Sequence, residues 1–212
     1  AVGVANGQVY VIGGNDGSSG SSIPIAIVEM YDPQSNTWVR KADLPTARAY
    51  LSGVMFNNLI YIIGGQGDGG TRTGKVEVYD PAINTWTARE DMPTRRSQAV
   101  AVVLGSKIYV IGGSATGPDG MNTVEEHDPS LQDTNPFITE TWFARNPLLF
   151  GRAGAVAGVV NNKIYVIGGR NDPGVGVTVV EEGTLSASPK VSLPSSSAAF
   201  GDVPLGITGE KT

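Results

Sequence analysis

One short pattern, an aliphatic–Tyr–aliphatic run that ends in Gly-Gly, occurs four times and limits the possible folds of this chain more than any other feature. The second glycines, at positions 14, 65, 113 and 169, are separated by steps of 51, 48 and 56 residues. A period near fifty residues is typical of repeat architectures, in which similar units stack on one another. The copies are Gln8-Val-Tyr-Val-Ile-Gly-Gly14, Leu59-Ile-Tyr-Ile-Ile-Gly-Gly65, Lys107-Ile-Tyr-Val-Ile-Gly-Gly113 and Lys163-Ile-Tyr-Val-Ile-Gly-Gly169.

A β-hairpin is expected at the start of each repeat. A run of small and aliphatic residues, such as Leu51-Ser-Gly-Val-Met-Phe56, precedes the pattern, and a polar pair such as Asn57-Asn58 separates the two. Asparagine and glycine tolerate the positive φ angles of tight hairpin turns, so the two runs are predicted to pair as antiparallel strands. Because both runs are apolar nearly throughout, we expect these strands to be buried on both faces.

Two further strands are expected after Gly-Gly. A polar, glycine-rich loop of variable length leads to a third strand in which charged residues are interleaved, as in Val76-Glu-Val-Tyr-Asp80. An Asp-Pro pair ends this strand in three repeats, because proline cannot continue a ladder. Asn-Thr-Trp begins the fourth strand, with Trp38 and Trp86 each six residues after the aspartate. From Asp128 to Trp142 the distance is fourteen residues, an insertion of eight.

Four antiparallel strands in every ~50 residues predict an all-β fold made of β-propeller blades, which bury their faces by stacking on one another. The order Gly-Gly, Tyr-Asp-Pro, Asn-Thr-Trp and Pro-Thr-x-Arg resembles the Kelch repeat family over roughly residues 1–182. This resemblance implies a β-propeller of four-stranded antiparallel blades with about four blades present. We place these blades at about residues 1–47, 48–95, 96–151 and 152–197.

The C-terminal end of the repeat array departs from the pattern. Residues 183–212 lack the Asp-Pro and tryptophan of the other repeats, so they are read as a degenerate end of the fourth repeat, the start of a possible fifth, or a flexible tail. Within them, Lys190-Val-Ser-Leu-Pro-Ser195 is similar to Lys41-Ala-Asp-Leu-Pro-Thr46, which favours a weak strand at 188–193. Kelch propellers usually have six or seven blades, and the resemblance therefore implies that these four are part of a larger propeller.

Composition and charge exclude several classes of function. The formal net charge of −5 argues against a nucleic-acid partner, which needs a basic surface. No apolar run approaches the ~20 residues of a membrane-spanning helix. Cysteine is absent and His127 is the single histidine, so thiol chemistry and zinc or copper sites of ordinary ligand sets are excluded. We expect no cofactor, and the cellular compartment stays open.

Three arginines occupy one repeat position and are the sharpest candidates for a binding site. Arg48, Arg96 and Arg152 each lie 17 residues before the second glycine of their repeat. The resemblance places them in loops that open on one face of the propeller. One hypothesis is a cluster of guanidinium groups that binds carboxylates or phosphates by paired hydrogen bonds. The alternative is that each arginine holds its own loop by bonding backbone carbonyls or the neighbouring blade. Arg95 is not a repeat position and is interpreted as a surface contact.

The loops after Gly-Gly supply the other candidates. Each contains an aspartate, and the fourth loop begins with Arg170; the aspartates are Asp16, Asp68, Asp119 and Asp172. Carboxylates here could act as general acids or bases on a sugar, but aspartate is also routine in glycine-rich turns. The Gly-Gly pairs are not followed by the Gly-Lys-Ser/Thr of a phosphate loop. We interpret them as positions where the chain turns so tightly that Cβ atoms would collide. His127 stands where other repeats have tyrosine, so it is interpreted as a substituted structural aromatic.

Two functions are consistent with these residues. The first is a non-catalytic Kelch binding module that recognises a protein or glycan partner, possibly acidic, through the loops on one face, where binding residues commonly lie. The second is an enzyme acting on acidic sugars, similar to a sialic-acid epimerase or a lyase, in which the loop arginines would hold a sugar carboxylate. We favour the binding module, with Arg48, Arg95, Arg96, Arg152, Arg170 and the four loop aspartates as candidate contacts.

Overall fold

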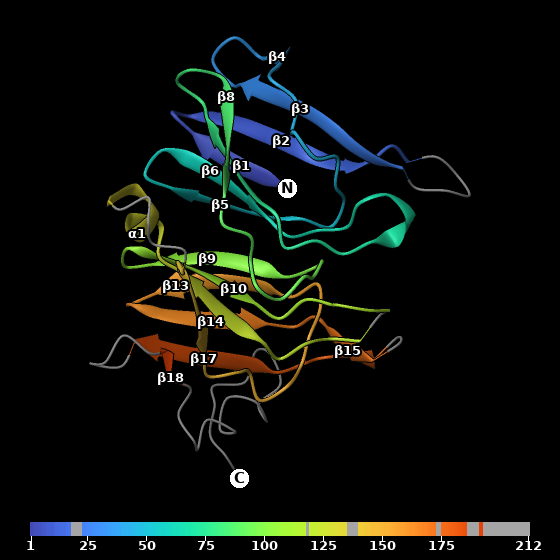
Figure 1. Cartoon of the computed structure of the whole chain (residues 1–212), viewed down its shortest axis with the longest axis vertical. Coiled ribbons are helices and arrows are strands. Elements are labelled where there is room, and N and C mark those ends of the chain that lie inside the picture. Colours follow the sequence, from blue (N-terminus) through green and yellow to red (C-terminus); the bar gives the residue numbers. More distant parts are fainter. Residues whose placement is uncertain (18–22, 118, 135–139, 173–174, 186–190, 193–212) are drawn as a thin grey trace. The chain divides into compact units, whose positions relative to one another are not determined.

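The computed structural model describes residues 1–17, 23–117, 119–134, 140–172, 175–185 and 191–192. The chain divides into two compact units, Ala1–Ser97 and Gln98–Thr212. Each unit contains two four-stranded antiparallel sheets, and the strands are drawn in sequence colours in Figure 1. These sheets are β-propeller blades of the Kelch type, so the predicted all-β fold with about four blades is confirmed.

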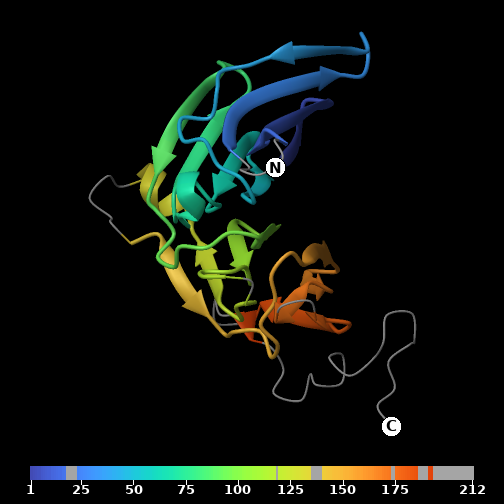
Figure 2. The same cartoon turned by 90° about the vertical axis from the view of Figure 1, so that its right-hand side faces the viewer.

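The first unit contains the first two blades. In the first blade, hydrogen bonds join the strands in the order β1 (Val2–Ala5), β2 (Gln8–Asn15), β3 (Pro24–Asp32) and β4 (Thr37–Arg40). The second blade has the same order in β5 (Ser52–Phe56), β6 (Leu59–Ile63), β7 (Val76–Asp80) and β8 (Thr85–Arg89), with a 3₁₀ turn at Asp68–Gly70. Figures 1 and 2 show these strands from two directions.

The second unit repeats this topology with an added helix and an added hairpin. The third blade consists of β9 (Val100–Leu104), β10 (Lys107–Ile111), β11 (Val124–His127) and β12 (Trp142–Arg145). Helix α1 (Pro129–Thr134) occupies part of the eight-residue insertion, and Asp128 begins it by accepting hydrogen bonds from the N–H and Oγ of Ser130. The fourth blade consists of β13 (Val156–Val160), β14 (Lys163–Ile167), β17 (Val180–Leu185) and β18 (Val191–Ser192). A separate hairpin is formed by β15 (Arg170–Asp172) and β16 (Val175–Gly176).

The hairpin turns have the geometry that their residues predict. Asn57 and Asn58 have φ angles of 48° and 62°, and Asn161 and Asn162 have φ angles of 49° and 59°. Two consecutive positive φ angles define the turn whose twist matches that of paired strands. The strands on either side pair in register, as expected, from Ser52 opposite Ile63 to Phe56 opposite Leu59.

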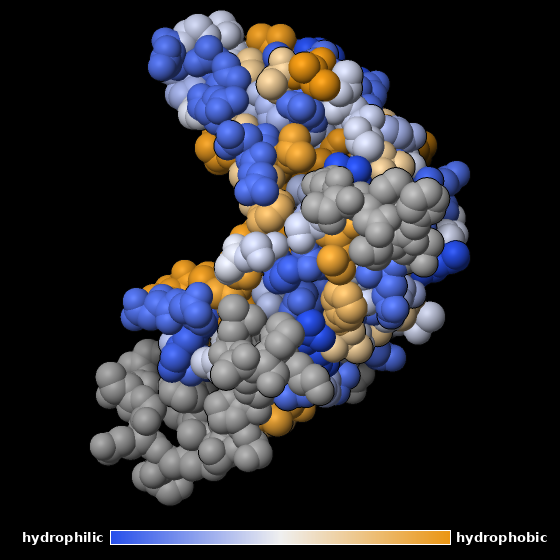
Figure 3. Space-filling model, turned by 60° about the vertical axis from the view of Figure 1, so that its left-hand side comes forward, coloured by the Kyte–Doolittle hydropathy of each residue, from blue (hydrophilic) through white to orange (hydrophobic). Residues whose placement is uncertain are grey.

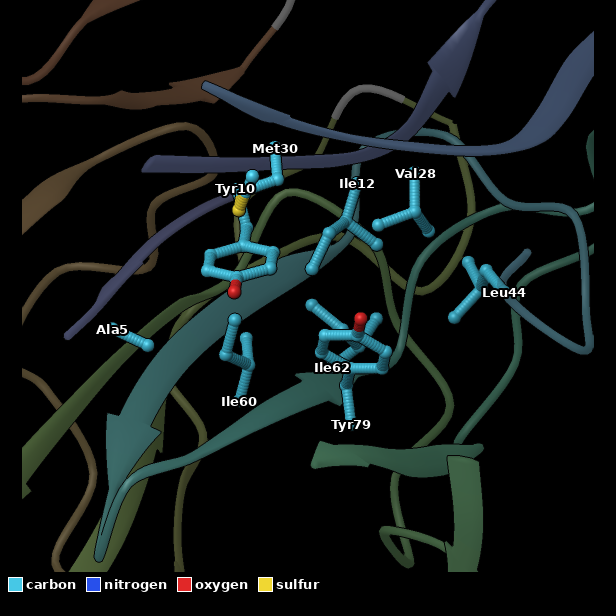
Figure 4. Packing of buried hydrophobic residues seen from close by; sticks show 9 residues of the cluster. All are labelled: Ala5, Tyr10, Ile12, Val28, Met30, Leu44, Ile60, Ile62 and Tyr79. Atoms are coloured by element: carbon cyan, nitrogen blue, oxygen red, sulfur yellow. The ribbon is translucent and has the colours of Figure 1, made fainter. Parts of the chain in front are cut away.

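Each unit is held together by a core between its two blades. In the first unit this core includes Tyr10 and Ile12 of the first blade with Ile60, Ile62 and Tyr79 of the second. Figure 4 shows these side chains together with Leu44, which comes from the linker between the blades. The rings of Tyr10 and Tyr79 are 5.7 Å apart, in a tilted arrangement that aromatic pairs favour. In the second unit, a cluster including Tyr109, Ile111, Leu148, Ile164 and Val166 has the same role.

An aromatic pair joins the third and fourth strands of three blades. The ring of Tyr31 lies 5.1 Å from Trp38, and that of Tyr79 lies 5.0 Å from Trp86. His127 replaces the tyrosine in the third blade and stacks on Trp142 at 4.7 Å. His127 is fully buried, so its interpretation as a substituted structural aromatic agrees with the structure.

Three sequence expectations differ from the structure or lie beyond it. Burial on both faces holds for β6 and β10 but is wrong for β13, which is mostly exposed, and for β1, which is exposed at alternate residues. Apolar side chains of both strands reach the surface, since Val2 and Val4 are 60% and 57% exposed and Val156 and Val160 are 61% and 57% exposed. Of the strand expected at 188–193, β18 is described and pairs with β17. The possible fifth repeat lies outside the described residues.

Candidate functional site

The Gly-Gly pairs fix where each loop begins. Gly64 and Gly65 have φ angles of 63° and 107°, a region that favours glycine. A Cβ atom on Gly64 would lie 2.6 Å from the carbonyl oxygen of Arg96, and the N–H of Gly65 donates to that same oxygen at 2.9 Å. Gly112 and Gly113 make the equivalent contacts with Arg152, at 2.5 Å and 2.8 Å. The glycines therefore let each loop pack against the linker that enters the next blade.

Arg48 is enclosed within the second blade. Its side chain is 0% exposed. Nη1 donates to the carbonyl oxygens of Gly64 at 2.6 Å and Lys75 at 2.9 Å, while Nη2 donates to Oε2 of Glu77 at 2.6 Å. Burial lowers the pKa of Arg48, and the charge and hydrogen bond of Glu77 oppose this shift. The guanidinium group thus joins the start and the end of the loop at 64–75 to strand β7.

Arg152 repeats this arrangement in the fourth blade. It is also 0% exposed, donates to the carbonyl oxygens of Gly168 and Val179 at 3.1 Å and 3.0 Å, and forms an ion pair with Glu181. Burial lowers the pKa of Arg152, and Glu181 opposes this shift. Arg96 is equally buried, and its Nη1 donates to the carbonyl oxygen of Thr94 at 3.2 Å.

The hypothesis that Arg48, Arg96 and Arg152 form a ligand-binding cluster is contradicted by this burial. A guanidinium group that is 0% exposed cannot present its donors to a ligand without disrupting the blade around it. Arg48 and Arg152 each bond one backbone carbonyl of their own loop, that of Thr46 or Phe150 at 3.3 Å, and two carbonyls of the loop after Gly-Gly in the same blade. The enzyme hypothesis required the same arginines to hold a sugar carboxylate, and their burial argues against that role as well.

Two of the remaining candidates of the first unit, Asp68 and Arg95, lie on neighbouring segments at one end of the second blade. Ala49 pairs with Gln66, and Gln66 pairs in turn with Arg72. The N–H of Arg96 donates to the carbonyl oxygen of Thr73 at 3.3 Å, which brings the segment at 95–96 against the same loop. We call the exposed residues Tyr50, Asp68 and Arg95 on these segments the first loop cluster. Asp16 is exposed on the first blade and accepts a hydrogen bond from the N–H of Ile23 at 3.1 Å.

A similar group lies at one end of the fourth blade in the second unit. Arg170 is exposed and donates from Nη2 to Oε1 of Gln98 at 2.9 Å. The exposed Asp119 adjoins Gly120, whose N–H donates to the carbonyl oxygen of Asn171 at 3.0 Å. We call Gln98, Asp119 and Arg170 the second loop cluster. Asp172 is placed by its backbone in β15, next to this cluster.

Tyr50 and Gln98 were not identified from the sequence. Both lie two residues after a repeat arginine, and their φ angles are 51° and 56°. Gly154, at the same position of the next repeat, has a φ angle of 65°. A left-handed backbone costs a residue with a side chain about 1–2 kcal/mol, and such strain gathers at functional sites. The Tyr50 side chain is 50% exposed. The glycine at the same position of the next repeat, Gly154, was the signal that could have revealed these residues.

The described residues offer little for other kinds of site. They contain no group of three or more histidine, aspartate or glutamate side chains that could hold a metal ion. None of the helices in the described part is long and apolar enough to cross a membrane. A cavity of about 10 Å³, lined by residues including Ile111, Leu148 and Val166, lies in the second unit. Such a volume has room for about one water molecule.

Comparisons with known proteins agree with the fold. A family model described as the KLHDC2/KLHL20/DRC7 Kelch-repeats domain matches residues 1–180. Beta-scruin of Limulus polyphemus is 38% identical over 73 residues, which cover 33% of this chain and 8% of beta-scruin. Kelch-like protein 35 of Homo sapiens is 38% identical over 73 residues, which cover 34% of this chain and 12% of that protein.

A solved structure, that of YjhT, is similar with a TM-score of 0.58 and 18% identity, covering 91% of this chain and 82% of the YjhT chain. At this level of identity the similarity concerns the fold alone. The matched segments of the curated relatives are a small part of their length, so the relatives inform the repeat and not the activity of a whole protein.

Proposed function

Because this chain belongs to the KLHDC2/KLHL20/DRC7 Kelch-repeats domain family, we propose that it is a non-catalytic binding module whose partner is another protein. The partner would contact the first loop cluster, at one end of the second blade. A fold alone does not define a function, so the proposal depends on the loop residues themselves.

The observation that carries the proposal is the contrast between Arg48 and its neighbour Tyr50. The Arg48 guanidinium is fully buried and bonded to both ends of its loop, whereas the Tyr50 side chain, two residues later, is half exposed on a strained backbone. A rigid frame that presents an aromatic side chain to solvent lowers the entropic cost of binding. Tyrosine and arginine are also the side chains that most often dominate protein interfaces.

The charges of the loop clusters indicate the chemistry of the partner. Arg95 is an exposed cation and Asp68 is an exposed anion, so the first loop cluster carries charges of both signs. A partner surface with a carboxylate opposite Arg95 and an apolar group over Tyr50 would be complementary to this cluster. Such a mixture of charge signs suits a protein surface better than a uniformly anionic ligand.

The proposal is tested by site-specific photo-cross-linking. A photoreactive phenylalanine analogue is placed at position 50 in one variant and at position 83 in another. Ile83 is 67% exposed and belongs to the turn between β7 and β8, at the opposite end of the same blade. It is therefore a matched control in exposure and chemistry.

We expect a protein to be cross-linked from position 50 and not from position 83. The cross-linked protein is then purified, and its affinity is measured with the Arg95→Ala variant, which is expected to weaken binding. Equal cross-linking from both positions, or an affinity that Arg95→Ala leaves unchanged, would refute the proposal.

A further inference from the structure

The linker that enters the fourth blade differs from the other two linkers at two positions. The three linkers end in Leu44-Pro-Thr-Ala-Arg48, Met92-Pro-Thr-Arg-Arg96 and Leu148-Leu-Phe-Gly-Arg152. The first residue and the last arginine of each segment are buried, so the three segments are anchored in the same way. Leu149 and Phe150 therefore stand where the other linkers have proline and threonine.

Both of these side chains reach the surface. Leu149 is 46% exposed and Phe150 is 40% exposed. Pro45 and Pro93, which occupy the position of Leu149 on the linkers to the second and third blades, are also exposed. Exposure at this position is thus common to all three linkers, including the two whose blades are followed by another described blade.

Exposed apolar side chains occur elsewhere on this protein and do not by themselves indicate a site. Figure 3 shows such side chains at several places on the surface, which is normal for a folded chain. Leu149 and Phe150 differ from these because they are adjacent and depart from a repeat pattern at a surface position. Aromatic side chains are also enriched at the centres of protein interfaces.

The backbone beneath this apolar pair is firmly held. The carboxylate of Glu181 accepts hydrogen bonds from the N–H of Leu149 at 2.6 Å and from the N–H of Phe150 at 3.2 Å. The N–H of Leu148 donates to the carbonyl oxygen of Asn122 at 2.8 Å. An apolar side chain on a backbone that is already fixed loses little conformational entropy when it binds.

Phe150 has no part in satisfying the glutamate through its side chain. In the second blade, the matching carboxylate of Glu77 accepts a hydrogen bond from the hydroxyl of Thr46 at 2.8 Å. In the fourth blade, backbone N–H groups replace that hydroxyl as donors to Glu181. The change from threonine to phenylalanine therefore adds exposed apolar surface without serving this contact.

Charged groups lie beside the apolar pair. A Cβ atom added to Gly151 would collide with the carbonyl oxygen of Gly120, so the linker packs directly on the segment that carries Asp119. The N–H of Gly120 in turn donates to the carbonyl oxygen of Asn171 at 3.0 Å, next to Arg170. Asp119 and Arg170 are both exposed. The apolar pair and the two charges thus belong to neighbouring segments of the second unit.

Arg170 is the group of this surface that can bind a carboxylate. Among the described residues, its side chain donates to the neutral Oε1 of Gln98 at 2.9 Å and forms no ion pair. A guanidinium group binds a carboxylate by paired, charge-assisted hydrogen bonds.

We propose that Leu149, Phe150 and Arg170 form a docking surface for a protein segment that carries a large apolar side chain close to a carboxylate. The apolar side chain would cover Leu149 and Phe150, and the carboxylate would pair with Arg170. The nearby Asp119 would disfavour segments that are acidic throughout. The surface lies within the second unit and shares no residue with the first loop cluster, so it is independent of the proposed function.

The test begins with random peptides displayed on phage and selected on the whole chain. The peptides are first depleted on the variant Leu149→Pro/Phe150→Thr, which restores the residues of the other two linkers and is expected to fold as they do. This depletion removes peptides that bind elsewhere, the first loop cluster included. We expect the enriched peptides to combine a leucine, methionine or aromatic residue with a nearby aspartate or glutamate.

One enriched peptide is then labelled, and its affinity is measured by fluorescence anisotropy. Phe150→Thr and Arg170→Gln should each weaken binding about tenfold, as expected for interface hot spots. A second peptide, in which the carboxylate is replaced by an amide, should bind the Arg170→Gln variant as tightly as the first peptide does. Ile83→Thr is the control, since Ile83 is 67% exposed in the first unit, and it should leave the affinity unchanged.

Three results would overturn the proposal. The first is a selection in which no peptide is enriched after depletion. The second is a set of enriched peptides that lack carboxylates, or whose affinity Arg170→Gln leaves unchanged. The third is self-association of the chain in analytical ultracentrifugation that Phe150→Thr abolishes, which would assign the surface to a second copy.

Discussion

Replacement of Arg48 by methionine should strongly destabilise the first unit. The change leaves the Glu77 carboxylate, which is 5% exposed, without its cation. It also removes the donors to the carbonyl oxygens of Gly64 and Lys75. Methionine replaces the aliphatic part of the arginine side chain, so the effect reports mainly the charge and the hydrogen bonds.

The expected cost is about 3–5 kcal/mol, the range for removing one partner of a buried ion pair. A domain has a total stability of about 5–15 kcal/mol, so this loss is a large fraction of it. In the double variant Arg48→Met/Glu77→Gln no unpaired charge is buried. We therefore expect the double variant to be more stable than Arg48→Met alone.

Urea unfolding followed by tryptophan fluorescence measures this effect, since Trp38 and Trp86 both lie in the first unit. With a denaturant dependence of about 2 kcal/mol per molar urea, the midpoint should fall by about 1.5–2.5 M. Arg95→Met is the control, because Arg95 is exposed and its replacement should change stability by about 0.5 kcal/mol or less. Equal midpoints for Arg48→Met and Arg95→Met would refute the structural role of the repeat arginine.

Three further changes test other parts of the structure. Gly64→Ala places a Cβ atom 2.6 Å from the Arg96 carbonyl oxygen and should lower the melting temperature far more than Gly7→Ala, where an added Cβ meets nothing within 4 Å; equal effects would contradict the packing role. Burial raises the pKa of Tyr79 to about 12. The contribution of the neutral Tyr79 hydroxyl to the free energy of unfolding is therefore complete below the unfolded pKa of about 10 and is lost as pH rises towards 12. Tyr79→Phe should therefore cost about 1 kcal/mol at pH 7 and reduce the fall in stability between pH 9 and pH 11, measured by urea unfolding at each pH. Tyr50→Gly relieves the left-handed backbone and should keep the melting temperature within a few degrees while weakening the protein partner; a large loss of stability would mean that Tyr50 is structural.

The repeat pattern was sufficient to predict the fold. Gly-Gly, Asp-Pro and Asn-Thr-Trp each have a local reason for their position, because glycine, proline and asparagine restrict or permit particular φ angles. The turns at Asn57-Asn58 and Asn161-Asn162 have the positive φ angles that the sequence predicted. The helix α1 was not predicted, since a six-residue segment has too few turns to show a helical period.

The candidate site was predicted less well, because spacing alone does not tell where a side chain points. The position of Arg48 in the repeat was recognised, but its partner Glu77 is 29 residues away on another strand, and their pairing depends on the folded blade. The left-handed backbone of Tyr50 follows from the pairing of Ala49 with Gln66, which is also a contact of the fold. Local sequence therefore located the loops, whereas the buried and exposed members of each loop required the structure.

The affinity of the cross-linked protein partner for Tyr50→Ala, compared with Ile83→Ala, tests the central claim most directly. Both side chains are at least half exposed, at 50% and 67%, and they lie at opposite ends of the second blade. A module that binds through its loop clusters should lose at least about tenfold in affinity with Tyr50→Ala, as for an interface hot spot, and should be unchanged with Ile83→Ala. Unchanged affinity with Tyr50→Ala, or a comparable loss with Ile83→Ala, would contradict binding through the loops.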